Sequence, residues 1–249
     1  MAVMEWDKVD ETVAVITMTN GENRHNPAFV KAILQIFDEV ERDESVTSII
    51  VTSNDAKNWS QGMDLAWMLP FYEGKKRQEL KDFMYNINDM FKRILHMPMP
   101  VIAAINGHVF GNGAIMACCC DFRFMRSDRG FFCFPEIDNS IPFMPGTLPI
   151  IKKAFPYYKL EEAVLSGKRY SGAELATHHV IVKACADRTE LMKESIAFGK
   201  SFNKQRPICG EIKKRFNKEI IQVIDTEDPA LIEPLDLIVW AGFRFQARS

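Results

Sequence analysis

The chain has 249 residues, of which 47% are hydrophobic and 26% are charged, and its formal net charge is −2 at pH 7. This is the composition of a globular protein, and it excludes a disordered chain and a protein whose overall charge would attract nucleic acid or a membrane surface. The first residues lack the basic start and apolar run of a signal peptide, and no apolar stretch reaches the roughly 18 residues of a membrane span, so we expect a soluble, cytoplasmic protein.

The first part of the chain predicts a hairpin followed by a strand–helix–strand unit. Residues 3–9 and 12–18 alternate or run apolar, which predicts the hairpin. Apolar residues at helical spacing predict a helix over 27–43, and Pro27 suits its first turn. A short β-branched run predicts a strand over 48–52.

The middle of the chain continues this alternation. Apolar residues three and four apart between 80 and 95 predict a helix, which the prolines at 98 and 100 end. A strand is expected over 101–105, and a buried helix over 114–118 follows a glycine-rich turn.

The last part of the chain is expected to be mostly helical. Two strands are expected over 122–124 and 131–134. From residue 146 helical patterns dominate, interrupted by an apolar run over 180–182, and the clearest of them cover 187–203, 208–224 and 229–243.

The six cysteines give no sign of a metal site. Neither the run 118–120 nor Cys133, Cys185 and Cys209 show the paired spacing of metal ligands. We therefore expect buried free thiols.

Three segments rich in polar or turn residues follow predicted strands, at 58–65, 106–113 and 134–138. At such a transition main-chain N–H groups can point outward and bind an oxygen atom, and two such turns could form an oxyanion hole. A dinucleotide site is a poor interpretation of 107–113, because its glycines fall as Gly-x-x-x-Gly-x-Gly and no acidic residue follows at the required distance.

In this order the segments resemble the motifs of the crotonase superfamily, the enoyl-CoA hydratases and isomerases, over most of the chain. The family's first loop reads Phe-(Ser/Cys/Ala)-Ala-Gly-x-Asp-Leu, and Trp59 to Leu65 are similar, with Trp for Phe and Gln for Ala. Its second loop reads Asn-Gly-x-x-x-Gly-Gly-Gly, and Asn106 to Gly113 differ in having Asn112 in place of the middle glycine. The family's Cys-Asp and Pro-Glu-(Ile/Val) are matched by Cys120-Asp121 and Pro135-Glu136-Ile137.

The resemblance implies the crotonase fold, an α/β spiral of ββα units. It implies that the spiral core covers residues 1–190 and that a helical region over 191–249 mediates the formation of a homotrimer or hexamer.

The resemblance also implies the site. The main-chain N–H groups of Gln61 and Asn112 would hold the oxygen of an acyl-CoA thioester, and Glu136 would be the acid/base. Coenzyme A would enter as part of the substrate, with no other cofactor and no metal. The coenzyme path would be lined by Asn112 and the first loop, namely Ser60, Gln61, Met63, Asp64 and Leu65.

Several of these assignments have an equally good alternative. Arg24, His25 and Lys57 are candidates to meet the coenzyme's phosphates, but solvated surface charges are at least as good an interpretation. Asp64 could equally cap the helix that follows it.

Position 115 departs from the family's hydratases, which carry a second glutamate there. Ile115 can neither donate nor accept a proton, which leaves Glu136 alone. One carboxylate suffices to move a proton from C2 to C4 of a 3-enoyl thioester, so the chain most resembles the Δ3,Δ2-enoyl-CoA isomerases of fatty acid metabolism. We expect apolar neighbours, Phe134, Ile115 and Phe143, to raise the pKa of Glu136.

Two other functions stay open. One is a different crotonase reaction, such as hydration, hydrolysis or carbon–carbon cleavage of a specialised acyl-CoA. The other is a catalytically silent acyl-CoA-binding protein.

Overall fold

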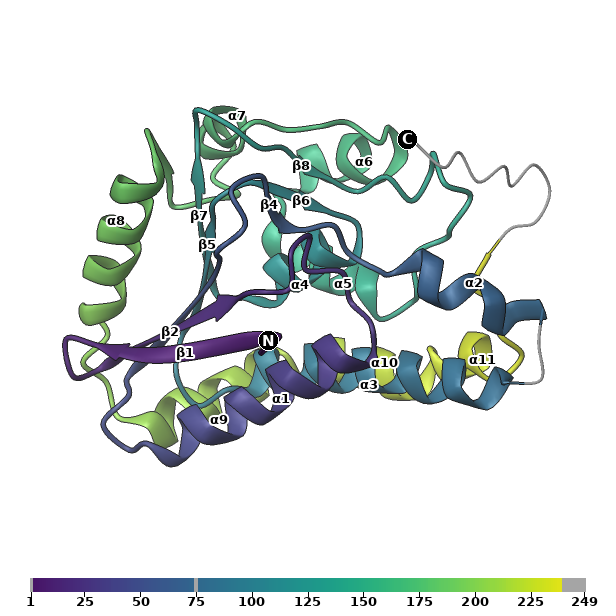
Figure 1. The fold of residues 1–249 in the computed structure, drawn as a ribbon, viewed down its shortest axis with the longest axis horizontal. Coiled ribbons are helices and arrows are strands. Elements are labelled where there is room, and N and C mark those ends of the chain that lie inside the picture. The colour runs from purple at the N-terminus through teal and green to yellow at the C-terminus, as the bar shows by residue number, and fades with distance from the viewer. Residues whose placement is uncertain (1, 74–75, 239–249) are drawn as a thin grey trace.

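The computed structural model describes residues 2–73 and 76–238, and its strands form two sheets (Figure 1). Within these residues the main sheet has the strand order β1-β2-β3-β5-β7-β9, and the smaller sheet has the order β4-β6-β8. The main strands are β1 (Met4–Val9), β2 (Val13–Met18), β3 (Ser48–Ser53), β5 (Val101–Ile105), β7 (Phe122–Arg126) and β9 (Lys183–Cys185). The smaller sheet consists of β4 (Asn58–Ser60), β6 (His108–Phe110) and β8 (Phe132–Cys133).

The helices fall between and after the strands. The first four are α1 (Pro27–Arg42), α2 (Leu65–Glu73), α3 (Arg77–His96) and α4 (Asn112–Cys119). The later ones are α5 (Thr147–Ala154), α6 (Tyr157–Leu165), α7 (Gly172–Thr177), α8 (Arg188–Lys200), α9 (Arg206–Phe216), α10 (Lys218–Thr226) and α11 (Pro229–Ile232).

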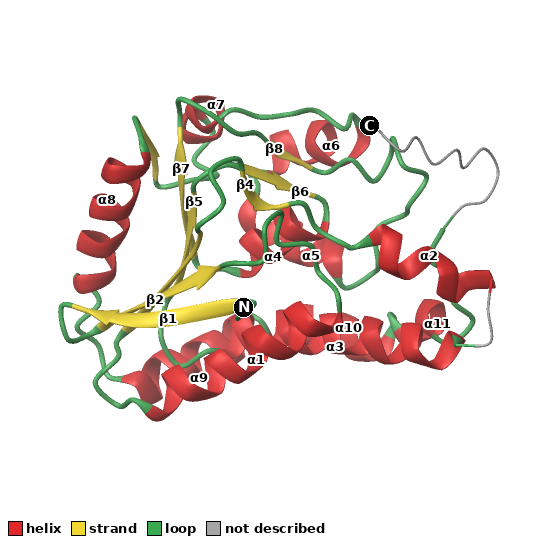
Figure 2. Cartoon of the chain, viewed as in Figure 1, coloured by secondary structure: helices red, strands yellow, loops and turns green. Residues whose placement is uncertain are grey.

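Helices cover both faces of the main sheet (Figure 2). On one face α8 places Leu191 in a cluster with Ile50, Ile102 and Phe124. On the other face the larger core cluster joins the sheet to α1, α3 and α4. Because both faces are covered, β3 and β5 are buried along their whole length, which explains their unbroken apolar sequences.

The chain winds as a spiral of repeating units. Three times a main strand leads to a strand of the smaller sheet and then to a helix: β3, β4 and the pair α2–α3; then β5, β6 and α4; then β7, β8 and α5. The pairs β3–β5 and β5–β7 are parallel, and so are β4–β6 and β6–β8. The expected α/β spiral of ββα units is therefore confirmed.

Most elements predicted from the sequence are present. The opening hairpin is the antiparallel pair β1–β2. The helix expected over 27–43 is α1, which the Asn26 side chain caps by accepting from the Phe29 N–H. The division expected at residue 190 falls within α8 and stays a prediction.

Two predicted C-terminal helices were wrong in their extent. The single helix expected over 208–224 is divided at Asn217, whose side chain donates to the Leu95 carbonyl and joins the break to α3. The helix expected over 229–243 ends at Ile232, and Leu235 has a φ of 60°, which helical backbone does not adopt. Residues 239–243 of that prediction lie outside the described residues. Of the helices that the structure does describe, none is both long and apolar enough to cross a membrane.

Candidate active site

The smaller sheet brings the three sequence motifs together. Its strands β4, β6 and β8 end at Ser60, Phe110 and Cys133, and the 58–65, 106–113 and 134–138 motifs continue from these ends. Because the strands are parallel and adjacent, their carboxyl ends lie at the same edge of the sheet. The motifs therefore meet although they are far apart in sequence.

Two glycines show how closely the motifs approach. A Cβ atom at Gly62 would lie 2.6 Å from the Phe110 carbonyl oxygen and 2.9 Å from the Asn112 nitrogen, so the first loop touches the start of α4. A Cβ atom at Gly111 would lie 3.4 Å from Glu136 Oε1. The Glu136 carboxyl group and the first loop thus both lie against the N-terminal end of α4.

The main-chain N–H of Asn112 makes no hydrogen bond to any residue that the structure describes, so it can bind a ligand. Asn112 is the first residue of α4, where N–H groups have no acceptor within the helix. The positive φ that this turn needs belongs to Gly111, at 53°, so the asparagine takes a helical conformation without strain.

The second predicted donor is wrong in this structure. The Gln61 N–H donates to the Glu22 carbonyl oxygen at 3.0 Å and is occupied. The segment 22–25 runs alongside the first loop, where the His25 N–H donates to the Gly62 oxygen and the Asp64 N–H to the His25 oxygen. This is a parallel bridge, in which Gly62 and Asp64 bond to His25 and Met63 lies between them. The N–H of such an intervening residue points away from the paired segment.

Met63 therefore supplies the donor that the sequence did not reveal. Its N–H makes no hydrogen bond to any residue in the described part of the chain. It follows Gly62, which lies against the Asn112 nitrogen. The motif alone gives no means of choosing between 61 and 63, because the donors are main-chain groups.

Glu136 is a buried, incompletely bonded carboxylic acid. Its residue is 9% exposed, and Oε2 has no hydrogen-bond partner among the described residues. Burial raises its pKa to about 7, against the opposing effect of a backbone hydrogen bond. Near neutral pH such a group can both take and return a proton.

The three apolar residues expected around Glu136 lie in or against the large core cluster, and their contact with the carboxyl group stays a prediction. Phe134 and Ile115 are buried in the large core cluster, and Phe143 packs against it with its ring centroid 6.0 Å from that of Phe134. Ile115 lies one turn into α4, where its N–H donates to the Gly111 oxygen. Position 115 therefore contributes a buried hydrocarbon side chain and no second carboxylate.

Two of the predicted coenzyme contacts are wrong. His25 is fully buried, and burial lowers its pKa to about 3, so it is neutral and cannot attract a phosphate. Ser60 is fully buried too, and its hydroxyl group bonds within the protein. Both side chains stabilise the loops and do not line a ligand path.

The other coenzyme candidates lie nearer the surface. Arg24 pairs with Glu22 at 2.8 Å on the surface. Asp64 caps α2 by accepting from the Trp67 N–H, which is the alternative role foreseen for it. Leu65 begins α2 and is half-buried.

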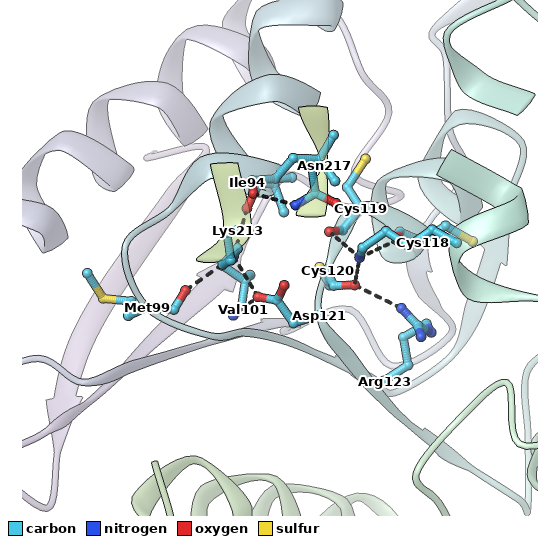
Figure 3. Close-up of polar contacts among 12 residues, drawn as sticks. Ile94, Met99, Val101, Cys118, Cys119, Cys120, Asp121, Arg123, Lys213 and Asn217 are labelled. Atoms are coloured by element: carbon cyan, nitrogen blue, oxygen red, sulfur yellow. Dashed lines mark hydrogen bonds and ion pairs between the residues drawn. The ribbon is translucent and has the colours of Figure 1, made fainter. Parts of the chain in front are cut away.

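A second buried polar cluster lies at the opposite, C-terminal end of α4. Lys213 Nζ pairs with Asp121 Oδ2 at 2.6 Å and donates to the Ile94 and Met99 carbonyl oxygens, and Arg123 donates to the Cys120 oxygen (Figure 3). A cavity of about 690 Å³ opens beside this cluster, away from Glu136. Since its charged groups are already paired, we assign this cluster to stability.

Comparisons with known proteins agree on one family. The profile of the family described as "Enoyl-CoA hydratase/isomerase" matches residues 8–227. "Enoyl-CoA delta isomerase 3" of Arabidopsis thaliana is 26% identical over 218 residues, which are 85% of this chain and 91% of that protein. "Enoyl-CoA delta isomerase 2, peroxisomal" of the same plant is 27% identical over 230 residues, 88% of this chain and 95% of that protein.

A solved structure shows the same fold. The crystal structure of an enoyl-CoA hydratase from Mycobacterium ulcerans matches with a TM-score of 0.81 and 18% identity, covering 93% of this chain and 98% of that one. At this identity the likeness concerns the fold alone.

Proposed function

The chain belongs to the enoyl-CoA hydratase/isomerase family, and on that premise we propose that it shifts a double bond in an enoyl-CoA thioester. Its reaction converts a 3-enoyl-CoA into the conjugated 2-enoyl-CoA, a step of fatty acid metabolism. The observation that carries this proposal is the buried carboxyl group of Glu136 beside the N-terminal end of α4. The position at which hydratases of the family hold a second glutamate is Ile115.

The reaction needs one proton carrier and one oxyanion hole. The Glu136 carboxylate takes a proton from C2, and the electron pair of that C–H bond passes into a dienolate whose charge rests on the thioester oxygen. The N–H groups of Asn112 and Met63 donate to that oxygen, and one such donor is worth ~2.7–4 kcal/mol. Glu136 then returns the proton to C4, which leaves the double bond between C2 and C3.

This chemistry balances without a metal or a redox cofactor. One proton and the electrons of one double bond change place within the same substrate, so nothing is oxidised or reduced overall. Coenzyme A takes part only as the thiol half of the thioester.

Hydration of a 2-enoyl-CoA is the alternative reaction. It requires a water molecule to be held and deprotonated while a proton is delivered to C2, a task that two acid/base groups share. Ile115 cannot take the second role, which favours the isomerase. A catalytically silent acyl-CoA-binding protein is the remaining alternative.

The test offers purified protein a 3-enoyl-CoA and, separately, a 2-enoyl-CoA. We expect rapid gain of the conjugated-thioester absorbance from the first substrate and slow or no loss of it from the second. Glu136→Gln should lose this turnover while it still binds an acyl-CoA, because the amide cannot take the proton. Dominant hydration by the wild type, or full turnover by Glu136→Gln, contradicts the proposal.

The assembly we propose is a homotrimer or hexamer. Ile208, Ile212 and Phe216 lie four residues apart on one side of α9 and are 55%, 59% and 72% exposed. Apolar side chains gathered in this way are typical of an interface. Sedimentation should show an assembly that Ile212→Asp dissociates, and a monomeric wild type contradicts this.

The location we propose is the cytoplasm. The name of one relative, "Enoyl-CoA delta isomerase 2, peroxisomal", makes the peroxisome the alternative. Imaging of the tagged full chain in its own cells separates the two.

A further inference from the structure

A buried chain of hydrogen bonds connects the two loops that carry the oxyanion donors. The Asn112 side chain lies 2.8 Å from His25 Nδ1, and His25 Nε2 lies 3.1 Å from Ser60 Oγ. Ser60 Oγ lies 2.8 Å from the Asn23 carbonyl oxygen and accepts from the Gly62 N–H at 3.1 Å. Asn112 belongs to α4, and Ser60 and Gly62 belong to the first loop. His25 belongs to the segment 22–25, which pairs with the first loop.

The direction of each hydrogen bond follows from the acceptors. The Asn23 carbonyl oxygen has no proton, so the single Ser60 hydroxyl proton must point to it. Ser60 Oγ then accepts from His25 Nε2–H, and a neutral ring with a proton on Nε2 has only Nδ1 as acceptor. Asn112 therefore donates through Nδ2 to Nδ1.

The ring has little freedom to leave this arrangement. His25 is fully buried and stacks on Phe29 with ring centroids 4.3 Å apart. Its pKa of about 3 keeps the ring neutral near neutral pH, and the two hydrogen bonds select the tautomer with its proton on Nε2. The network is thus one fixed arrangement and not a pH switch.

We propose that His25 is a positioning residue that sets the separation of the two main-chain N–H groups of the oxyanion hole, through Asn112 on one side and Ser60 on the other. Its effect on turnover rests on the proposed isomerase function, whereas its effect on the bound thioester does not. Through Nδ1 it holds the first residue of α4, whose own N–H is one donor. Through Ser60 it holds Gly62, whose neighbour Met63 supplies the other.

This arrangement explains the asparagine at position 112. The family motif has glycine at that position, and glycine has no side chain that could reach His25. The asparagine here ties the start of α4 to a histidine that comes from a third segment of the chain.

The test compares His25→Leu with His25→Gln. Leucine removes both ring nitrogens, whereas glutamine keeps one acceptor and one donor. We expect His25→Leu to lower kcat on a 3-enoyl-CoA by about tenfold or more while KM stays within about threefold, and His25→Gln to recover kcat to within about threefold of the wild type.

A second measurement uses a bound acyl-CoA and does not depend on turnover. The carbonyl stretch of octanoyl-CoA, labelled with carbon-13 at C1, should move to lower frequency on the wild-type protein, because the two donors polarise the bond. His25→Leu should lose part of this shift and His25→Gln should keep it. A wild type that shifts the carbonyl but does not isomerise would remove the proposed function and leave the role of His25 intact.

The matched control is Asn217→Ala, which removes another buried hydrogen bond, to Leu95, far from the motif loops. It should lower the melting temperature and leave kcat and the carbonyl frequency unchanged. Should His25→Leu fail to fold, Ser60→Ala replaces it and should show the same pattern to a smaller extent. Wild-type kcat in His25→Leu, or lost activity with an unchanged carbonyl frequency, overturns the proposal.

Discussion

The two ends of α4 show what separates a catalytic cluster from a structural one. Both ends are buried and polar. At the C-terminal end Lys153 Nζ donates to the carbonyl oxygens of Cys118, Cys119 and Cys120, and Lys213 pairs with Asp121. The positive charges thus satisfy the last carbonyl groups of the helix and oppose the negative end of its dipole.

At the N-terminal end the opposite holds. The Asn112 and Met63 N–H groups have no partner within the described residues. Neither does Glu136 Oε2, although buried polar groups are normally paired. Groups left unpaired in a buried place cost stability, and a substrate oxygen or proton can satisfy them. The cavity beside the C-terminal end is therefore less informative about function than the unpaired groups at the N-terminal end.

Breaking the polar cluster at the C-terminal end of α4 should cause the largest loss of stability. Lys213→Met leaves the carboxylate of Asp121, whose side chain is only 17% exposed, without its partner and should lower the free energy of unfolding by about 3–5 kcal/mol. Denaturant unfolding measures this, and kcat of the folded fraction should stay near that of the wild type. Adding Asp121→Asn should recover part of the loss, and a kcat that falls with Lys213→Met alone would place this cluster in the catalytic machinery.

Removing one donor at the N-terminal end should cost activity and little stability. Asn112→Pro deletes the N–H at the first position of α4, where proline is tolerated, and should lower kcat by about 10²–10³-fold. Asn112→Ala is the matched control, because it removes the same side chain but keeps the N–H. Equal kcat values in the two variants would show that the main-chain group does not bind the oxyanion.

The unpaired carboxyl group should make the protein less stable at high pH. The pKa of Glu136 is about 7 in the folded chain against 4.5 for the unperturbed group, so the folded state binds more protons between these values. Stability from this group is therefore full below about pH 4.5 and is lost as pH rises to about 7, at a cost of about 3 kcal/mol.

Glu136→Gln should consequently be more stable than the wild type at pH 8 by about 3 kcal/mol, and about as stable at pH 4.5. Denaturant unfolding at the two pH values measures the difference. A variant that is equally stable at both pH values would show that the carboxyl group is not held in an apolar site.

The sequence predicted the place of this site better than its details. The three motifs were expected to cooperate, and they do so because β4, β6 and β8 are parallel and end at one edge. The choice between Gln61 and Met63 depends on how the segment 22–25 pairs with the first loop, and no local pattern shows this.

The burial of His25 was unpredictable for the same reason. Its two partners, Ser60 and Asn112, come from segments 35 and 87 residues away. The break at Asn217 likewise depends on the remote Leu95 carbonyl. Periodicity reveals which residues face a core, but not which backbone groups meet across it.

Deuterium can show directly whether Glu136 carries the proton from C2 to C4. A 3-enoyl-CoA deuterated at C2 is converted by the wild type and by Glu136→Gln, and the label in the product is located by NMR. We expect a 2-enoyl-CoA that carries deuterium at C4 in the wild-type reaction, and no product from the variant. A product without deuterium at C4, formed equally fast by both proteins, would contradict this expectation.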